Sequence, residues 1–243
     1  MLNIIIPMAG LGSRFSKAGY TDPKPLIRIH SKQMIQIVIE NLTPNCEHKF
    51  TFIVRDEHIS KYGLDKYLKQ WAPNCNIIEL DHKTEGPACT VLMARDIINN
   101  NNPIMIANCD QYVDCNIDDY INKIGDNDGL IMTFKDNQDK WSYIEYDDDK
   151  NIIGVVEKVV VSDDATTGIY NFAKGLDFVK YADDMIANEQ RVNGEFYVAP
   201  VYTDMCNDNK KLTIFNIDGM YGLGVPDDLE YFLKNEISNK IKS

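Results

Sequence analysis

The stretch IIIPMAGLGSRFSKAGYTDPKPL, residues 4–26, sets the fold of this chain. It begins as an apolar strand, continues through Gly10 and Gly12 to Arg14, and ends with Lys24 between two prolines. Glycine permits positive φ angles and a close approach of the backbone to a ligand, and successive free N–H groups form a concavity that suits an anion. The stretch therefore predicts an anion-binding loop after the first strand of a sheet.

Several kinds of glycine loop follow strands in proteins. A dinucleotide-binding loop needs a third glycine where Phe15 stands, and a Walker A loop needs a Gly-Lys-Ser/Thr triplet at a spacing that neither glycine provides. A simple strand-to-helix turn also uses glycine. The pair of Arg14 and Lys24 favours an anion site, because solubility does not explain two cations beside one loop of an acidic protein.

Apolar runs alternate with helical patterns through the first half of the chain. The expected strands are Leu2–Ile6, Phe50–Val54, Asn76–Leu80, Ile104–Ala107 and Gly129–Thr133, and the expected helices are Gln33–Leu42, Ile59–Trp71 and Ala88–Ile98. Uniformly apolar strands separated by helices predict a parallel sheet covered on both faces, whose ligands bind at the carboxyl ends of the strands. The predicted fold class is α/β, with a Rossmann-like three-layer α/β/α arrangement.

From about Trp141 the pattern changes to closely spaced strands. SYIEYDDDKNIIGVVEKV (142–159) predicts two arms around a DDDKN turn, and TTGIYNF (166–172) predicts a further strand. Helices are expected again at Leu176–Ala187, Tyr197–Met205 and Asp227–Ile241. We expect the strands to form an antiparallel insertion that makes the sheet mixed and supplies the second wall of a cleft.

Composition narrows the classes of function. The 243 residues include 44% hydrophobic and 26% charged side chains, typical of a folded globular protein, and the net charge of −12 argues against a nucleic acid or an anionic membrane as partner. A cytoplasmic protein is predicted by three features. The six cysteines are scattered without a CxxC pair, the N-terminus lacks a leader pattern, and no apolar run reaches about 20 residues. The four histidines lie beside no serine or cysteine nucleophile motif, which argues against a hydrolase. A homodimer is only a generic expectation.

An ordered set of motifs resembles the NTP-transferase family, the nucleotidyltransferases that make sugar nucleotides and related activated alcohols. The motifs are PMAGLGSRF (7–15), PKPL (23–26), TEGPA (84–88), ANCDQYV (107–113), VVEK (155–158), TGIYNF (167–172), GEFYVAPVY (194–202) and GVPDDL (224–229). The resemblance covers nearly the whole chain. It implies one nucleotidyltransferase domain, 1–243, with a nucleotide-binding half at 1–135 and an acceptor-binding half at 136–243.

The implied reaction is attack by a phosphate oxygen of the acceptor on the α-phosphorus of a nucleoside triphosphate, with release of pyrophosphate. Such transfers depend on positioning and charge neutralisation, because the protein has little covalent chemistry to perform. By resemblance, Arg14 holds the β- and γ-phosphates, Lys24 holds the α-phosphate, and Lys158 holds the phosphate of the second substrate. Further residues implied at the nucleotide are Met8, Ala9, Gly10, Gly12, Asp81, Glu85 and Gly86, and those at the acceptor are Thr167, Gly168, Glu195 and Tyr197.

The resemblance also implies a divalent metal, Mg²⁺ with Mn²⁺ as a substitute. Asp110 follows the apolar strand PIMIA and so lies at a strand end, where a carboxylate is able to hold Mg²⁺ against the α-phosphate. Many relatives supply a second aspartate three residues before a Thr-Pro pair near the C-terminus, but Gly222 occupies that position here. Asp218 is an alternative second ligand, and a single metal held by Asp110 and phosphates is another.

The sequence favours CTP as the nucleotide. A carboxylate from Asp81 or Glu85 would accept a hydrogen bond from the amino group of cytosine or guanine, although the preference rests mainly on the resemblance of DQYV and EFYVAPVY to capsule-pathway cytidylyltransferases such as phosphoglutamine cytidylyltransferase. The expected role is therefore capsule or surface-polysaccharide biosynthesis. Hexose-1-phosphate thymidylyl-, guanylyl- or uridylyltransferase is the alternative within the family. A metal-dependent glycosyltransferase and a non-catalytic nucleotide-binding regulator are the alternatives outside it.

Overall fold

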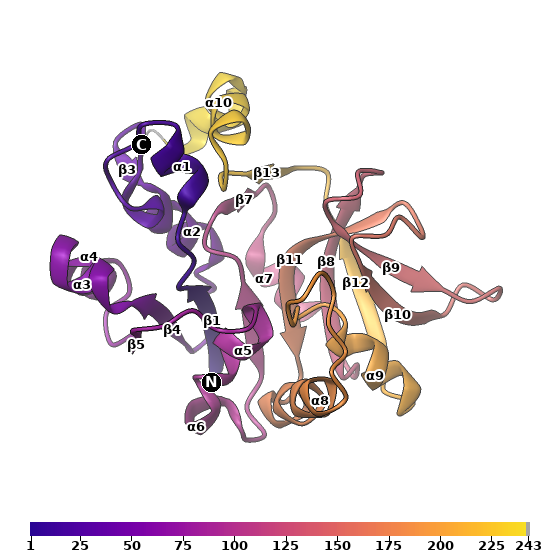
Figure 1. Cartoon of the computed structure of the whole chain (residues 1–243). Helices are drawn as coiled ribbons and strands as arrows, with labels where there is room; N and C mark the ends of the chain where they lie inside the picture. The colour runs from indigo at the N-terminus through magenta and orange to yellow at the C-terminus, as the bar shows by residue number, and fades with distance from the viewer. Residues whose placement is uncertain (242–243) are drawn as a thin grey trace.

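A nine-stranded mixed sheet forms the centre of the computed structural model, which describes residues 1–241 (Figure 1). Its strands are β1 (Leu2–Met8), β4 (His48–Arg55), β5 (Asn76–Leu80), β6 (Ile104–Ala107), β8 (Gly129–Lys135), β9 (Ser142–Tyr146), β10 (Ile152–Glu157), β11 (Asp164–Phe172) and β12 (Leu212–Asn216). Strands β5, β4, β1 and β6 are parallel neighbours. β11 is antiparallel to β6 and β8, and β12 pairs with β8 in parallel. The predicted mixed α/β sheet is confirmed.

The sheet forks along β11. The last part of this strand, Ile169–Phe172, pairs with β6, whereas Ala165 pairs with β9 on the same edge. β8 follows the other edge, with a break in register between Thr166 and Tyr170. Strands β6 and β9 therefore diverge on either side of Thr167 and Gly168. The divergence leaves an opening at the carboxyl end of β6, where ligands of open α/β sheets bind.

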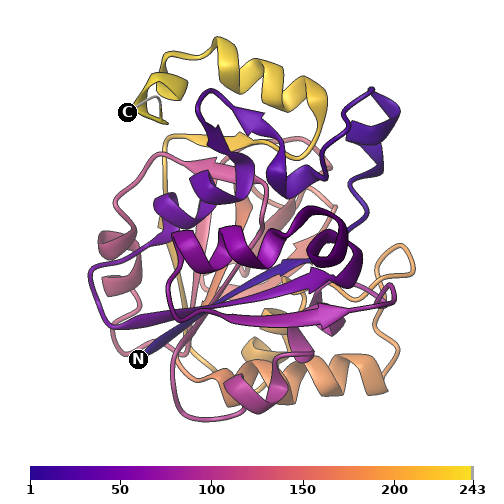
Figure 2. The same cartoon turned by 90° about the vertical axis from the view of Figure 1, so that its left-hand side faces the viewer.

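Helices cover both faces of the sheet, as three layers require (Figure 2). On one face lie α2 (Met34–Leu42), α4 (Leu64–Trp71) and α7 (Ile117–Asn122). On the other lie α5 (Pro87–Leu92), α6 (Arg95–Ile98), α8 (Gly175–Ala187) and α9 (Val201–Asn207). The remaining helices are α1 (Ser13–Lys17), η1 (Lys24–Leu26), α3 (Asp56–Tyr62), α10 (Pro226–Lys234) and η2 (Glu236–Ile241). No helix within residues 1–241 is both long and apolar enough to cross a membrane.

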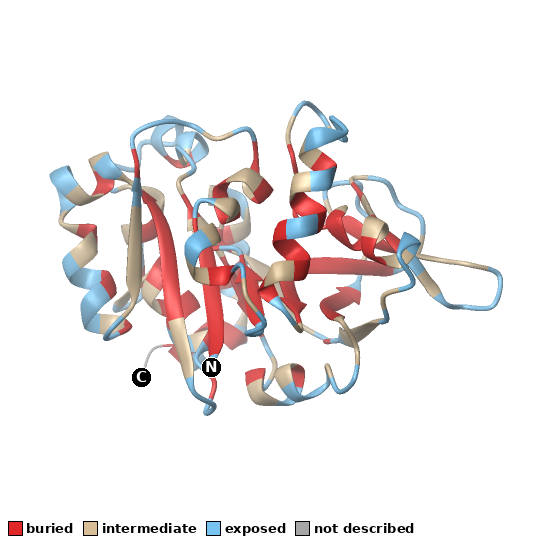
Figure 3. Ribbon diagram, turned by 90° about the horizontal axis from the view of Figure 1, so that it is seen from below, coloured by how far each residue is buried: buried red, intermediate tan, exposed pale blue. Residues whose placement is uncertain are grey.

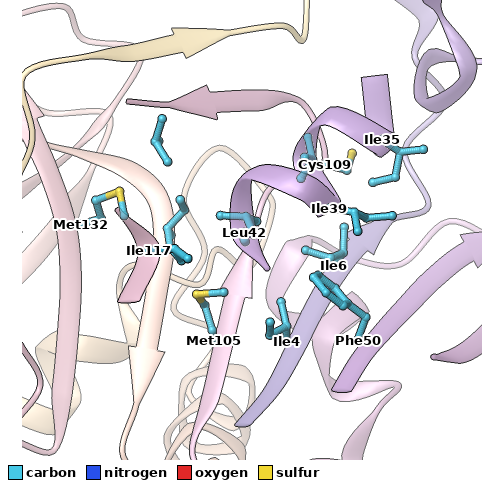
Figure 4. Packing of buried hydrophobic residues seen from close by; sticks show 14 of the residues in the cluster. Ile4, Ile6, Ile35, Ile39, Leu42, Phe50, Met105, Cys109, Ile117 and Met132 are labelled. Carbon is cyan, nitrogen blue, oxygen red and sulfur yellow. The ribbon is translucent and has the colours of Figure 1, made fainter. Parts of the chain in front are cut away.

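The apolar residues of β1 explain why it lies at the centre. Ile4 and Ile6 belong to the core on the side of α2, where Figure 4 shows Ile6 beside Ile39 and Ile4 near Phe50, and Ile5 joins the core on the opposite face. Burial of each such side chain stabilises the fold by about 1.5–3 kcal/mol. Figure 3 shows the same pattern at the scale of the molecule, with buried strands between partly exposed helices. A strand buried on both faces has no polar alternation, which is why its sequence is uniformly apolar.

Several predicted helices end earlier or are divided. The expected helix Ile59–Trp71 is two helices that meet at Gly63, which has φ 64 and ends α3, and Ala88–Ile98 is divided into α5 and α6. The helix predicted over Tyr197–Met205 was wrong in its first turn, because α9 begins only at Val201. Pro200 precedes α9, and a residue before proline avoids helical angles.

Two small sheets were missed by the sequence analysis. β7 (Gln111–Val113) pairs antiparallel with β13 (Met220–Gly222), and β2 (Arg28–Ile29) pairs with β3 (Lys32–Gln33). A separate apolar cluster joins this region to α10, which Figure 1 shows beyond β13. Strands of two or three residues are too short for alternation to reveal them. They matter because β13 carries the C-terminal segment back to the end of β6.

Stability should fall in mild acid because of one buried histidine. Burial lowers the pKa of His58 on α3, and its Nδ1 has no hydrogen-bond partner among residues 1–241. The imidazole of His58 therefore binds a proton more readily in the unfolded chain than in the folded one. As the pH falls below 6.5, the free energy of unfolding decreases by up to about 1.4 kcal/mol per pH unit. Urea unfolding of wild type and His58→Phe between pH 7 and 5 tests this prediction. Equal pH slopes in the two proteins would contradict it.

Candidate active site

Two adjoining cavities open where β1 and β6 end. The loop cavity, about 260 Å³, is lined by Met8, Ala9, Gly10, Lys24, Pro25, Lys83, Thr84, Gly86, Thr90, Cys109, Asp110 and Glu195. The fork cavity, about 240 Å³, is lined by Ile106, Lys140, Trp141, Ser142, Glu157, Lys158, Thr166, Thr167, Gly168, Tyr170, Tyr197, Val198 and Ala199. Pro7, Pro87 and Asn108 line both. A ligand in one cavity therefore lies beside a ligand in the other.

An ion pair between Lys24 and Asp110 lies in the loop cavity. The Lys24 Nζ is 2.7 Å from Oδ2 of Asp110, and the two side chains are 17% and 25% exposed. Burial by itself lowers the pKa of an amine, but the adjacent Cys109 and Asp110 raise the pKa of Lys24 above its ordinary value. Burial raises the pKa of the Cys109 thiol to about 11, so this thiol is neutral at pH 7. Lys24 therefore remains a cation at pH 7 in the lining of the loop cavity.

The position of the Asp110 carboxylate favours glycine at 224. A Cβ at Gly224 would lie 2.3 Å from Oδ2 of Asp110, so a side chain there would displace this carboxylate. The Leu223 N–H donates to the Asp110 carbonyl at 2.8 Å, so this C-terminal segment follows the end of β6 closely. At Gly222 a Cβ would lie 2.9 Å from Oδ2 of Asp228, in the first turn of α10. The carboxylate of Asp228 thus lies where a side chain at 222 would begin.

Asp110 fits a magnesium ion held jointly with phosphates. Mg²⁺ is commonly bound by one or two carboxylates together with substrate phosphates and water. Asp110 lines the loop cavity, and no group of three or more His, Cys, Asp or Glu side chains suited to a metal occurs in residues 1–241. Asp218 is exposed, follows β12, and lines neither cavity. The described side chains therefore fit a metal that arrives with its nucleotide better than a metal in an all-protein cage.

Lys158 reaches the fork cavity from a strained backbone. It follows β10 with φ 59, a left-handed conformation uncommon for a residue other than glycine, and its N–H donates to the Trp141 carbonyl at 2.9 Å. The Nζ donates to the Tyr197 hydroxyl and lies 4.2 Å from the centre of that ring. Lys158 is 33% exposed, so it is accessible to an anion entering this cavity.

A buried carboxylate lies on the same wall of the fork cavity. Glu157 is 8% exposed and accepts a hydrogen bond from Ser142, and its Oε1 is 3.9 Å from the Nζ of Lys158. Burial raises the pKa of Glu157, although Ser142 and Lys158 oppose the shift. A buried carboxylate is costly, and its position at a cavity surface indicates a ligand with hydroxyl or amine donors.

The structure brings most of the predicted site residues to the two cavities. Met8, Ala9, Gly10, Lys24, Gly86 and Asp110 line the loop cavity, and Lys158, Thr167, Gly168 and Tyr197 line the fork cavity. Glu195, predicted at the acceptor, lines the loop cavity instead. The cavities show where these residues lie, and the role of each residue stays a prediction.

Four predicted residues line neither cavity. Arg14 is exposed on α1, and Gly12 begins that helix with φ 61. Asp81 is 84% exposed and bonded to His82, and Glu85 is 66% exposed and ion-paired with Arg191. The argument that a carboxylate from either residue selects cytosine is not supported by these positions.

The sequence analysis missed several cavity residues. Asn108 lies within the quoted motif ANCDQYV, and Glu157 lies directly before Lys158, but neither was selected as a site residue. Consecutive residues of a strand face opposite sides, which would separate Glu157 from Lys158 if the strand continued. The left-handed turn at Lys158 removes that alternation. Lys83 had no sequence signal beyond its place in the TEGPA loop region.

Comparisons with known proteins agree with this geometry. A family model described as nucleotidyl transferase matches residues 3–221. Mannose-1-phosphate guanylyltransferase catalytic subunit beta of Dictyostelium discoideum is 27% identical over 180 residues, which are 70% of this chain and 49% of that protein. The bifunctional protein GlmU of Methanococcus maripaludis is 27% identical over 174 residues, 70% of this chain and 39% of that protein. The chain thus spans about half or less of these curated relatives.

A solved structure matches over nearly its full length. The nucleoside-diphosphate-sugar pyrophosphorylase of Vibrio cholerae superposes with a TM-score of 0.83 at 26% identity, covering 96% of this chain and 100% of that chain. The similarity includes the strands that build both cavities, since these extend from β1 to β11 and the match covers almost the whole molecule.

The close approach at residue 224 gives a sharp test. In Gly224→Ala the new methyl group displaces the Asp110 carboxylate, and the ion pair with Lys24 is lost with it. Titration calorimetry with MgCl₂ in the presence of nucleoside triphosphate should show metal affinity at least about tenfold weaker, the size of one lost charged contact. Gly219→Ala, whose Cβ would meet the Tyr221 side chain at 3.2 Å, is the matched control. Unchanged metal affinity in Gly224→Ala would refute the role of this carboxylate.

Proposed function

The chain belongs to the nucleotidyl transferase family, and we propose that it joins a nucleoside triphosphate to a hexose 1-phosphate or similar small phosphorylated acceptor, with release of pyrophosphate. One observation carries this proposal. Two cavities of similar size, each lined by two lysines, meet at Pro7, Pro87 and Asn108 beyond the ends of β1 and β6. Two phosphorylated ligands are able to occupy them side by side.

The lysines of the site reduce the electrostatic repulsion between the two phosphorylated substrates. Like unit charges about 5 Å apart repel by about 3 kcal/mol at an effective dielectric of 20, and two phosphate groups present several such pairs. In the proposed reaction an oxygen of the acceptor phosphate forms a bond to the α-phosphorus, and the bond from that phosphorus to the bridging oxygen breaks. Lys24 neutralises the nucleotide phosphate and Lys158 neutralises the acceptor phosphate. No proton has to be abstracted from the attacking group.

Asp110 is the residue proposed to hold the metal. A bound Mg²⁺ would supply additional positive charge at the α-phosphate. Asp110 would hold the metal with an oxygen that now accepts from Lys24, and Lys24 lies beside the place where the phosphate would bind. Arg14 remains a proposed β- and γ-phosphate ligand, although it is exposed on helix α1 and does not line the loop cavity.

The hexose 1-phosphate proposal draws on the relatives and on Glu157. The Dictyostelium relative is named for mannose 1-phosphate, and the Vibrio structure is named for nucleoside-diphosphate sugars. A buried carboxylate on the wall of the fork cavity suits the hydroxyl groups of a sugar. In the proposed division of the chain, residues 1–135 bind mainly the nucleotide and 136–241 mainly the acceptor, the last two residues lying outside the described part.

CTP with phosphoglutamine, in capsule biosynthesis, is the second candidate. The motifs DQYV and EFYVAPVY favour it, because they resemble capsule-pathway cytidylyltransferases. Glu157 also suits an amine donor, so the fork cavity is compatible with either acceptor. The base contacts proposed at Met8, Ala9 and Gly86 are chiefly backbone contacts.

A pyrophosphate-release screen tests the proposal. CTP, UTP, GTP and dTTP are each combined with a panel of hexose 1-phosphates and with phosphoglutamine, with and without MgCl₂. We expect metal-dependent release with at least one pair, and Lys24→Ala should reduce it by about 100-fold or more because the cation acts on the developing charge. Lys61→Ala, an exposed lysine on α3, is the control. Lack of pyrophosphate from every pair, or full activity of Lys24→Ala, would overturn the proposal.

Glu157→Gln should make the protein more stable but less active. Because burial raises the pKa of Glu157, the folded state binds this proton more tightly, and stability falls as the pH rises from about 4.5 through the folded pKa. Glutamine keeps the hydrogen bond to Ser142 without a buried charge. Chemical unfolding at pH 8 should show a gain of about 0.5–2 kcal/mol, with a raised KM for the acceptor. A loss of stability at pH 8 would contradict this explanation.

A further inference from the structure

Four polar side chains form a continuous chain of contacts between the two cavities. Lys83 at the loop cavity lies 3.2 Å from Oε1 of Glu195. The other oxygen of Glu195, Oε2, accepts a hydrogen bond from the Tyr197 hydroxyl at 3.1 Å. That hydroxyl in turn accepts from the ammonium of Lys158 in the fork cavity. Every donor in the series faces an acceptor, so the orientation of each group depends on its neighbour.

The segment that carries Glu195 and Tyr197 is held firmly in place. The Phe196 N–H donates to the Glu85 carbonyl and its own carbonyl accepts from Ala88, both at 3.0 Å. The Phe196 ring is fully buried, and the Arg191 guanidinium lies 4.0 Å from its centre. Gly86 is required beneath it, because a Cβ there would lie 2.4 Å from the Phe196 carbonyl oxygen. Residues 195 and 197 therefore project from a rigid support, and only their side chains are free to respond to a ligand.

The orientation of the Lys158 ammonium depends on the segment that carries Tyr197. A lysine side chain loses up to about 2 kcal/mol of rotamer entropy when it is fixed. The left-handed backbone at Lys158 sets the direction of the stem, and the hydrogen bond described for its Nζ is that to the Tyr197 hydroxyl. The nearest carboxylate, Glu157, is 3.9 Å away. Without the hydroxyl the ammonium would sample other rotamers, and a phosphate would have to order it on arrival.

We propose that Tyr197 is the positioning residue for Lys158, that Glu195 anchors Tyr197, and that Lys83 makes this anchor sensitive to anions in the loop cavity. Lys83 is 71% exposed and shares Glu195 with Tyr197. A triphosphate in the loop cavity competes for Lys83, and Glu195 is then left to accept from Tyr197 alone. A carboxylate with fewer competing cations is a stronger acceptor, and hydrogen bonds in series strengthen one another. Lys158 is consequently held more firmly when the loop cavity is filled.

The proposal gives Glu195 a role other than contact with the acceptor. It rests on the proposed function only for the identity of the anion that enters the loop cavity. The positioning of Lys158 by Tyr197 follows from the contacts themselves and is open to test without any substrate.

Lysine acylation with N-hydroxysuccinimidyl acetate, read residue by residue by peptide mass spectrometry, measures how firmly each ammonium is held. In Tyr197→Phe the ring remains but the hydroxyl is lost, and Lys158 should react about tenfold faster, as expected for the loss of one hydrogen bond to a charged group. Tyr181→Phe is the matched control, because Tyr181 bonds Asp208 at 2.9 Å and lies under Lys180 outside both cavities. Equal Lys158 rates in wild type and Tyr197→Phe would overturn the positioning role.

Inorganic triphosphate tests the link to the loop cavity. In the wild type it should slow the acylation of both Lys24, which reports occupancy, and Lys158. In Lys83→Met and Glu195→Gln it should still protect Lys24 but no longer slow Lys158. If Lys158 is still protected in both variants, the anion binds Lys158 directly. If only Lys24 is protected in the wild type, filling the loop cavity does not affect Lys158. Either result overturns the proposed coupling through Lys83 and Glu195. If Lys24 is never protected, the phosphate site of the proposed function fails, while the Tyr197→Phe comparison still decides the positioning role.

Discussion

The change of partners along β11 is the constraint on which the site depends. At Gly168 the strand leaves β9 and joins β6, with φ 83 and with so little space that a Cβ would lie 2.1 Å from Nδ2 of Asn108. Only glycine accommodates both conditions. Asn108 consequently lies against the bend of β11 and lines both cavities. One glycine thus opens the sheet and places the residue that the two ligand sites share.

The charge distribution follows from the same geometry. The chain carries a net charge of −12, yet three of the four cavity lysines lie beside a polar or acidic partner: Lys24 on Asp110, Lys83 on Glu195 and Lys158 on Tyr197. A buried or half-buried cation without a partner is costly, so the partners of Lys24 and Lys158 hold these two lysines in place before any ligand arrives, whereas Lys83 is exposed. Phosphate or metal is able to replace each partner, because the pairs lie at cavity surfaces.

Sequence reasoning succeeded where burial dictates residue type. The strands β1 and β6 were predicted closely because a strand buried on both faces has to be apolar, and the glycine loop with Lys24 pointed to the correct end of β1. It failed where a side chain's position depends on distant segments. The contacts of Glu195 with Lys83, 112 residues away in sequence, and of Gly224 with Asp110 arise from tertiary packing, and no local pattern encodes them. The first turn predicted for α9 failed for a local reason, the proline at 200 directly before the helix, and Tyr197 lines the fork cavity instead.

A carboxylate from α10 lies beside the glycine at 222. Gly222 pairs with Gln111, next to Asp110, and the space that its side chain would take is occupied by the carboxylate of Asp228. Asp228 lies in the first turn of α10, where the helix dipole favours a negative charge. An aspartate at 222 would place a second carboxylate against Asp228, and like charges at that distance repel strongly. Glycine at 222 and aspartate at 228 are therefore mutually dependent. The segment beside Asp110 has one carboxylate here, and it comes from Asp228 of α10.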